Sequence, residues 1–245
     1  MSILITRPAP SGNELTQRLI DAGKLAFHAP LIKIIAGREL PLLDDKLKAL
    51  SAGDYVLLLS KNAVHYANWQ LNQLQQSWPD TLSYYGIGKS TALAFQEISE
   101  RLTHYSQQGE TSEDLLILPA LNQVKDKRIL LLRGNGGRDL LAKTLRKRGA
   151  IVEECECYQR LFIQYSPEDF ATQWEKKQIE TLVVTSGEML QRLFFLVAEP
   201  KKAWLLNCHL IVVSERLATI AEELGWKQIT VADSAHNDAL FRALI

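Results

Sequence analysis

One pattern recurs in this chain at a constant distance and limits the folds that it can adopt. In residues 129–149, four aliphatic residues run into Arg-Gly-Asn-Gly-Gly-Arg and then into an amphipathic segment. Residues 3–23 have the same order 126 positions earlier, so that Arg7 corresponds to Arg133. The same shift relates two further pairs of segments, residues 54–60 with 180–186 and residues 86–92 with 212–218. Three pairs in one register predict an internally duplicated chain.

Each repeated unit predicts a strand, a loop and a helix. An apolar run of four residues is too short for a helix and is typical of a buried parallel strand. The glycines of residues 134–137 allow a sharp turn, Asp139 is a candidate helix cap, and Gly149 is the expected glycine at the helix end. Because strands alternate with helices along the chain, we expect an α/β fold of parallel sheets with helices on both faces.

Length, charge and cysteine content narrow the class of protein. A duplicated chain of 245 residues favours two domains. The 28 basic and 28 acidic residues cancel, which argues against a general nucleic-acid binder. No apolar run approaches the roughly 20 residues of a membrane span and no signal peptide is recognisable, so we expect a cytoplasmic protein. Three cysteines fit a reducing compartment, and neither they nor the five histidines have metal-ligand spacing.

Polar residues gather where the expected strands end. In parallel sheets, ligands bind at the carboxyl ends of the strands. Those ends carry Arg7, Ser60, Gly88, Thr91, Arg133, Ser186 and Ser214. Each of the four hydroxyl residues alone is expected to cap a helix. Together, at equivalent places in two repeats, they could line a site with hydroxyl and N–H groups for carboxylates or phosphates.

The glycine loop at residues 134–137 also allows a dinucleotide-binding interpretation. Glu153 or Glu154, about 20 residues further on, would then be the acid that binds the ribose. Asp139 stands where the third glycine of that motif belongs, and a simple tight turn explains the glycines equally well.

Tyr158 ends another expected strand. A tyrosine in such a place usually packs, but its phenol can also donate a proton. The chain contains no His-Glu-x-x-His, no Gly-x-Ser-x-Gly and no Walker loop.

At these residues the chain resembles the uroporphyrinogen-III synthase family. The matching segments are Leu4-Ile5-Thr6-Arg7-Pro8, Pro30-Leu31-Ile32, Ser60 before Asn62-Ala63-Val64, Gly86-Ile87-Gly88 before Thr91-Ala92, the loop 133–138, Tyr158-Gln159, and residues 213–218 and 237–240. Each motif is loose, but their order and spacing over the whole length are specific. Leu59 departs from the pattern, because the family often has Thr or Ser before the serine.

The resemblance implies a particular domain organisation. Two α/β lobes would be joined by a two-stranded ladder of residues 31–35 and 158–163, with the first strand–helix unit of each repeat exchanged into the other lobe. The first lobe would comprise residues 1–36 and 163–245, and the second lobe residues 37–162. The substrate cleft would lie between them.

The resemblance also implies a reaction. The chain would be a cofactor-free lyase without metal, converting hydroxymethylbilane to uroporphyrinogen III with loss of water and inversion of the last pyrrole ring. Tyr158 would be the proton donor. The eight substrate carboxylates would be bound by Arg7, Arg138 and the helix N-termini at Ser60, Thr91, Ser186 and Ser214. A monomer in transient contact with the preceding pathway enzyme, binding no nucleic acid and no membrane, is expected.

Two other classes of function stay open on the sequence. One is an NAD(P)-dependent oxidoreductase that uses the loop from Gly134 to Gly137. The other is a two-lobed module that binds a small anion without chemistry.

Overall fold

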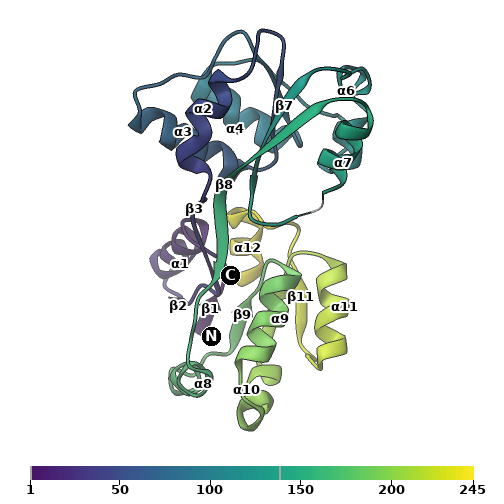
Figure 1. Ribbon diagram of the computed structural model, residues 1–245. Helices are drawn as coiled ribbons and strands as arrows, with labels where there is room; N and C mark the ends of the chain where they lie inside the picture. The colour runs from purple at the N-terminus through teal and green to yellow at the C-terminus, as the bar shows by residue number, and fades with distance from the viewer. Residues whose placement is uncertain (1, 138) are drawn as a thin grey trace. The chain divides into compact units, whose positions relative to one another are not determined.

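The structure is a computed structural model that describes residues 2–137 and 139–245. Its chain divides into two compact units, which we call the terminal unit, residues up to Ile34 together with Leu161–Ile245, and the central unit, Ile35–Arg160. Both contain a sheet with helices packed on it (Figure 1). The expected α/β fold with parallel sheets is confirmed.

The sheet of the terminal unit is parallel throughout. Its strands lie in the order β11-β10-β9-β1-β2. They are β1 (Ser2–Ile5), β2 (Leu25–His28), β9 (Thr181–Val183), β10 (His209–Val212) and β11 (Ile229–Val231). The helices are α1 (Ser11–Asp21), α8 (Pro167–Lys176), α9 (Gly187–Leu196), α10 (Lys202–Asn207), α11 (Glu215–Leu224) and α12 (Asn237–Leu244).

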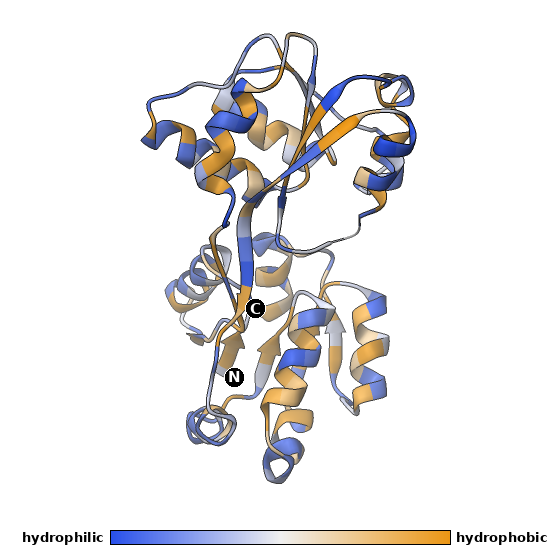
Figure 2. Cartoon of the chain, in the orientation of Figure 1, coloured by the Kyte–Doolittle hydropathy of each residue, from blue (hydrophilic) through white to orange (hydrophobic). Residues whose placement is uncertain are grey.

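Alternate residues of these strands enter two separate cores. Leu4, Leu182 and Leu210 pack with helices α8, α9 and α11. Ile3 and Ile5, on the other face, pack with α1 and α12. Side chains alternate between the two faces of a sheet, so a strand covered on both sides must be apolar at every position. This explains why β1, β9 and β10 each contain consecutive aliphatic residues, while polar and apolar residues mix along the helices (Figure 2).

The second sheet has the order β3-β8-β7-β4-β5-β6. Its strands are β3 (Ile32–Ala36), β4 (Tyr55–Leu58), β5 (Ser83–Gly86), β6 (Thr103–His104), β7 (Arg128–Gly134) and β8 (Ile151–Phe162). The helices of the central unit are α2 (Leu43–Lys48), α3 (Lys61–Gln73), α4 (Lys89–Ser99), α5 (Ser112–Leu116), α6 (Pro119–Asn122) and α7 (Leu140–Lys147). The pairs from β8 to β6 are parallel.

Some boundaries differ from the sequence-based expectation. The sequence pattern ended one strand at Tyr158, and the resemblance expected residues 158–163 as a separate ladder strand; in the structure one strand, β8, runs to Phe162 and has β3 beside it in the sheet. The short strands β2 and β6 were not predicted, because two to four residues with partly exposed side chains give no clear periodicity. Within the described residues no helix combines the length and the apolar character that a membrane crossing requires.

Candidate active site

Tyr158 lies on β8 directly beside the end of β7. It pairs with Gly134 in the sheet, and only 4% of its surface is exposed. The phenol ring covers Gly134 so closely that a Cβ atom there would come within 2.5 Å of the ring atom Cζ. The first glycine of the loop is therefore needed to leave room for the tyrosine ring.

The phenol oxygen of Tyr158 meets the N-terminus of α3. Ser60 precedes this helix with an extended backbone, and its Oγ accepts the N–H of Ala63 at 3.1 Å. The Ser60 hydroxyl in turn donates to the Tyr158 oxygen at 3.2 Å. A chain of hydrogen bonds polarises its members in one direction, so the helix amide and Ser60 make the phenol a better donor.

Two further side chains surround this tyrosine. An Nη of Arg160 lies 3.5 Å from the phenol oxygen, and its guanidinium carbon is 5.8 Å from the ring centre. The ring of Tyr66 stacks on that of Tyr158 at 6.3 Å, with 19° between the planes. Burial raises the pKa of Tyr66 above its ordinary value. Neither residue was a sequence-based site candidate; Arg160 was recognisable as a basic residue two positions after Tyr158, whereas nothing marks Tyr66.

The glycine loop is fastened to β8. The backbone N–H of Asn135 donates to the Tyr158 carbonyl at 3.1 Å, and its side-chain oxygen accepts the N–H of Arg160 at 2.6 Å. Arg133 pairs with Glu154 at 2.7 Å and donates to the Gly136 carbonyl at 2.6 Å. The loop is thus a tight turn held by its own neighbours.

These contacts disfavour the dinucleotide interpretation. Both acids that were candidates for the ribose already have cationic partners. Glu154 pairs with Arg133, and Glu153 lies 2.8 Å from Lys46. A ribose hydroxyl would have to compete with these ion pairs.

Thr91 does not cap α4. The helix begins at Lys89 with Gly88 as its N-cap, so Thr91 lies buried in the first turn. The carboxylate of Glu110 accepts the backbone N–H and the hydroxyl of Ser90 at 3.0 and 3.1 Å. It approaches Gly88 so closely that a Cβ there would be 2.1 Å from Glu110. The expectation that Thr91 caps this helix is therefore wrong, and the carboxylate of Glu110 accepts the hydrogen bonds at the helix N-terminus instead.

Capping is confirmed for the three serines. Besides Ser60, Ser186 accepts the N–H of Met189 at 3.2 Å and begins α9, and Ser214 accepts the N–H of Leu217 at 3.4 Å and begins α11. Both lie just after the carboxyl ends of strands of the terminal unit, as Arg7 does, so all three are on the same side of the parallel sheet. Arg138, the second basic residue expected at the site, lies outside the described residues.

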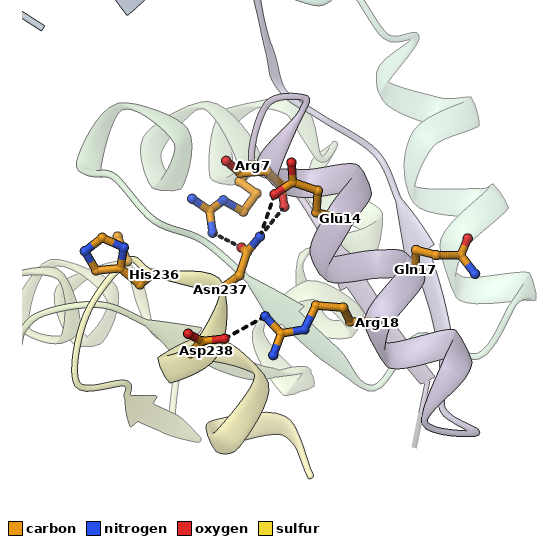
Figure 3. Close-up of a pocket in the computed structure, with 9 residues that line it drawn as sticks. Arg7, Glu14, Gln17, Arg18, His236, Asn237 and Asp238 are labelled. Atoms are coloured by element: carbon orange, nitrogen blue, oxygen red, sulfur yellow. Dashed lines mark hydrogen bonds and ion pairs between the residues drawn. The ribbon is translucent and has the colours of Figure 1, made fainter. Parts of the chain in front are cut away.

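Arg7 borders a pocket of about 710 Å³ between the N-terminal ends of α1 and α12 (Figure 3). Its guanidinium donates to Oδ1 of Asn237 at 2.6 Å. The amide nitrogen of Asn237 donates to the Ser11 carbonyl and to Glu14, each at 3.2 Å. Burial lowers the pKa of Arg7, and the nearby Glu14 opposes this shift. Asn237 was missed because it lies 230 residues from Arg7 in the sequence.

The structure therefore groups some of the expected residues and separates others. Tyr158 and Ser60 contact one another in the central unit. Ser186 and Ser214 cap different helices, Thr91 belongs to a third, and Arg7 contacts Asn237. Among the described residues, no group of three or more His, Cys, Asp and Glu side chains is placed to hold a metal ion.

Comparison with known proteins identifies the family. The family model described as uroporphyrinogen-III synthase HemD matches residues 13–242. A uroporphyrinogen-III synthase of Proteus mirabilis is 68% identical over 193 residues, which cover 79% of this chain and 97% of that protein. One of Escherichia coli strain K12 is 50% identical over 245 residues, with full coverage of both chains.

Solved structures agree on the fold. A mutant uroporphyrinogen III synthase of the extremely thermophilic bacterium Thermus thermophilus aligns with a TM-score of 0.63 at 18% identity, covering 100% of this chain and 99% of that one. The uroporphyrinogen-III synthetase of Helicobacter pylori 26695 aligns with a TM-score of 0.58 at 16% identity, covering 99% and 98%. The family model, the close relatives and the shared fold lead to one conclusion: the chain belongs to the uroporphyrinogen-III synthase family.

Proposed function

We propose that Tyr158 is the proton donor when this chain converts hydroxymethylbilane to uroporphyrinogen III. The family assigns the chain to porphyrin and haem biosynthesis as a lyase. The observation that carries our proposal is the hydrogen bond from Ser60 to the phenol oxygen. Because Ser60 donates this bond, the proton of the phenol is free to point to a ligand. A phenol can serve as a general acid for a leaving hydroxyl.

The proposed step balances without a cofactor. The phenol protonates the terminal hydroxyl, which leaves as water, and the pyrrole nitrogen lone pair forms a cationic azafulvene. For inversion, the cation attacks the substituted α-carbon of the last pyrrole, and the bond from this carbon to its original methylene breaks, which leaves a second azafulvene cation. That methylene then bonds to the free α-carbon of the same pyrrole, and the proton lost from this carbon returns to the phenolate. No electron is gained or lost. The protein has to orient the chain, donate one proton and exclude water from the cation.

Substrate recognition in this proposal is local, because the chain has no net charge to attract an octacarboxylate. Arg7 and Arg138 are proposed as cationic partners of the carboxylates. The proposed N–H and hydroxyl donors lie at the helix N-termini of Ser60, Ser186 and Ser214. Thr91 was expected to be a fourth donor, but the carboxylate of Glu110 already binds the N-terminus of its helix.

We also infer that the two units arose by duplication with an exchange of the first strand–helix segment. After the shift of 126 positions, the order β2-β1-β9-β10-β11 corresponds to β8-β7-β4-β5-β6. The pairing registers agree as well, with Ile5 beside His28 and Leu131 beside Glu154.

We propose that the substrate contacts both units, with residues 1–36 and 163–245 as one lobe and 37–162 as the other. A cytoplasmic monomer that meets the preceding pathway enzyme transiently completes the proposal.

The direct test is isomer analysis. Hydroxymethylbilane closes spontaneously to the symmetric isomer I, so the purified chain should divert it to isomer III, measured by chromatography after oxidation to porphyrins. Unchanged activity in the presence of a metal chelator is expected. Formation of isomer I alone, at the rate seen in buffer, would refute the proposal.

A further inference from the structure

Arg7 and Arg133, which correspond after the shift of 126 positions, have different partners. Arg133 follows Leu131 by two residues on β7, and Leu131 pairs with Glu154 of the neighbouring strand. That acid lies 2.7 Å from the Arg133 guanidinium and neutralises it. In the terminal unit Arg7 follows Ile5 by two residues, but Ile5 pairs with His28.

His28 does not replace the missing acid. Its Nε2 lies 2.8 Å from the backbone oxygen of Arg7, not against the guanidinium. The guanidinium instead donates to the neutral amide oxygen of Asn237. The other cation of this pocket, Arg18, is paired with Asp238 at 2.8 Å. Arg7 is thus a partly buried cation whose hydrogen-bond partner carries no charge.

The orientation of the Asn237 amide follows from its network. Its nitrogen faces two acceptors, the Ser11 carbonyl and the Glu14 carboxylate, so its oxygen must face Arg7 (Figure 3). In this orientation the amide satisfies Arg7 on one side and Glu14 on the other. It stands between a cation and an anion that would otherwise attract each other.

We propose that Asn237 is a positioning residue that keeps Glu14 from neutralising Arg7, so that Arg7 binds a carboxylate of the substrate in this pocket. The inference rests on the proposed function, since it supplies the ligand class. A charge-assisted bond from a guanidinium to a carboxylate is about twice as strong as a neutral one, but only if the guanidinium is not already paired. A direct Arg7–Glu14 pair would remove this advantage.

The test is a binding titration with uroporphyrin III, a stable oxidised octacarboxylate, on the intact chain. Asn237→Ala removes the amide, lets Glu14 approach Arg7, and should weaken binding on the order of tenfold. Adding Glu14→Gln to this variant should restore most of the affinity, because no acid is left to capture Arg7. Asn237→Asp places a carboxylate against Arg7 and should weaken binding with or without Glu14→Gln. Titrations are run below the melting midpoint of every variant.

Asn207→Ala is the matched control, because Asn207 is exposed at the end of α10 and should leave binding unchanged. Wild-type affinity in Asn237→Ala would overturn the proposal. So would weak binding that Glu14→Gln does not restore, since Asn237 would then act only through the fold. Failure of the wild-type chain to make isomer III would instead contradict the proposed function, which the titration does not measure.

Discussion

Tyr158 combines two properties that usually exclude each other, burial and a usable hydroxyl. The hydroxyl of a buried tyrosine normally donates to a backbone acceptor, as the hydroxyl of the partly buried Tyr165 does to the Pro30 carbonyl at 3.0 Å. Tyr158 instead receives a hydrogen bond from Ser60, and its ring is held between Gly134 and Tyr66. The ring is therefore held in place, while the phenol proton is not donated to Ser60.

Tyr158→Phe should therefore lower the turnover of hydroxymethylbilane by more than about tenfold while the fold and substrate affinity are kept. Loss of a central proton donor typically costs ~10²–10⁴-fold, and the ready ionisation of this substrate reduces the effect. Stopped assays of isomer III formation give the rate. Tyr165→Phe is the control, expected to reduce stability by about 1 kcal/mol without this loss of turnover. Equal turnover of wild type and Tyr158→Phe would mean that Tyr158 only packs.

At the scale of residues, the sequence predicted the site residues that lie at the ends of strands, and it missed the residues that reach the site from distant parts of the chain. Ser60 was identifiable because it directly follows an aliphatic run, and Tyr158 because it stands at the end of the expected strand 151–158. Asn237 and Glu110 act on residues 230 and 20 positions away, and no local pattern encodes such contacts. The wrong cap at Thr91 has the same cause, since Glu110 supplies the acceptor for α4.

At the scale of elements, the β7 loop and β8 form one support for the site. The loop holds β8 through Asn135, and its first residue makes room for the ring of Tyr158. The sequence predicted this strand–turn–helix unit from its glycines. It could not separate a phosphate-binding loop from a structural turn, because that choice depends on whether Arg133 and Glu154 meet.

Gly134→Ala should damage the fold and the site together. The new methyl would lie 2.5 Å from the Tyr158 ring, so the ring must move, at a cost of about 1–3 kcal/mol for an overpacked core. We expect a lower melting temperature and lower turnover. Gly187→Ala is the matched control at the start of α9, where the nearest atom would be 3.7 Å away, and it should raise stability by about 0.4–1 kcal/mol. Similar melting shifts in both variants would show that contact with Tyr158 is not the cause.

The junction of α10 and β10 contains a buried thiol that makes stability depend on pH. Burial, assisted by nearby Glu180, raises the pKa of Cys208 to about 12. The unfolded thiol ionises near pH 8.5, so the folded state binds the proton more tightly. The stability that this provides is complete below about pH 8.5 and is lost as the pH rises towards 12.

Cys208→Ala should remove this dependence. Denaturant unfolding between about pH 9 and 11 should show the wild type losing about 1.4 kcal/mol per pH unit more than Cys208→Ala. The variant is expected to be slightly less stable at pH 7, because a small buried side chain is lost. Parallel curves for the two proteins would place the alkaline loss of stability elsewhere.

At the scale of the whole molecule, the two sheets have equivalent strand order, but different side chains lie at the carboxyl ends of their strands. Serines cap equivalent helices at Ser60 and Ser186. In the proposed scheme the central unit supplies the acid, and its Arg133 is neutralised by Glu154. The terminal unit supplies an unneutralised Arg7 and has Ile32 at the position equivalent to Tyr158. In the proposed scheme an ancestral repeat accounts for the common scaffold, and these few differences assign proton donation and carboxylate binding to different units.

This division predicts that defects in the two units combine independently. Arg7→Ala should raise the KM for hydroxymethylbilane about tenfold, less so at high salt, because it removes a cation that binds the substrate. Tyr158→Phe should lower kcat.

In the described parts of the chain the two side chains share no hydrogen-bond partner, so the losses of transition-state free energy caused by the two substitutions should add. The double variant should lose on the order of a hundredfold in kcat/KM. A double variant no worse than the poorer single one would mean that Arg7 and Tyr158 act in the same step, and the separation of binding and chemistry between the units would be wrong.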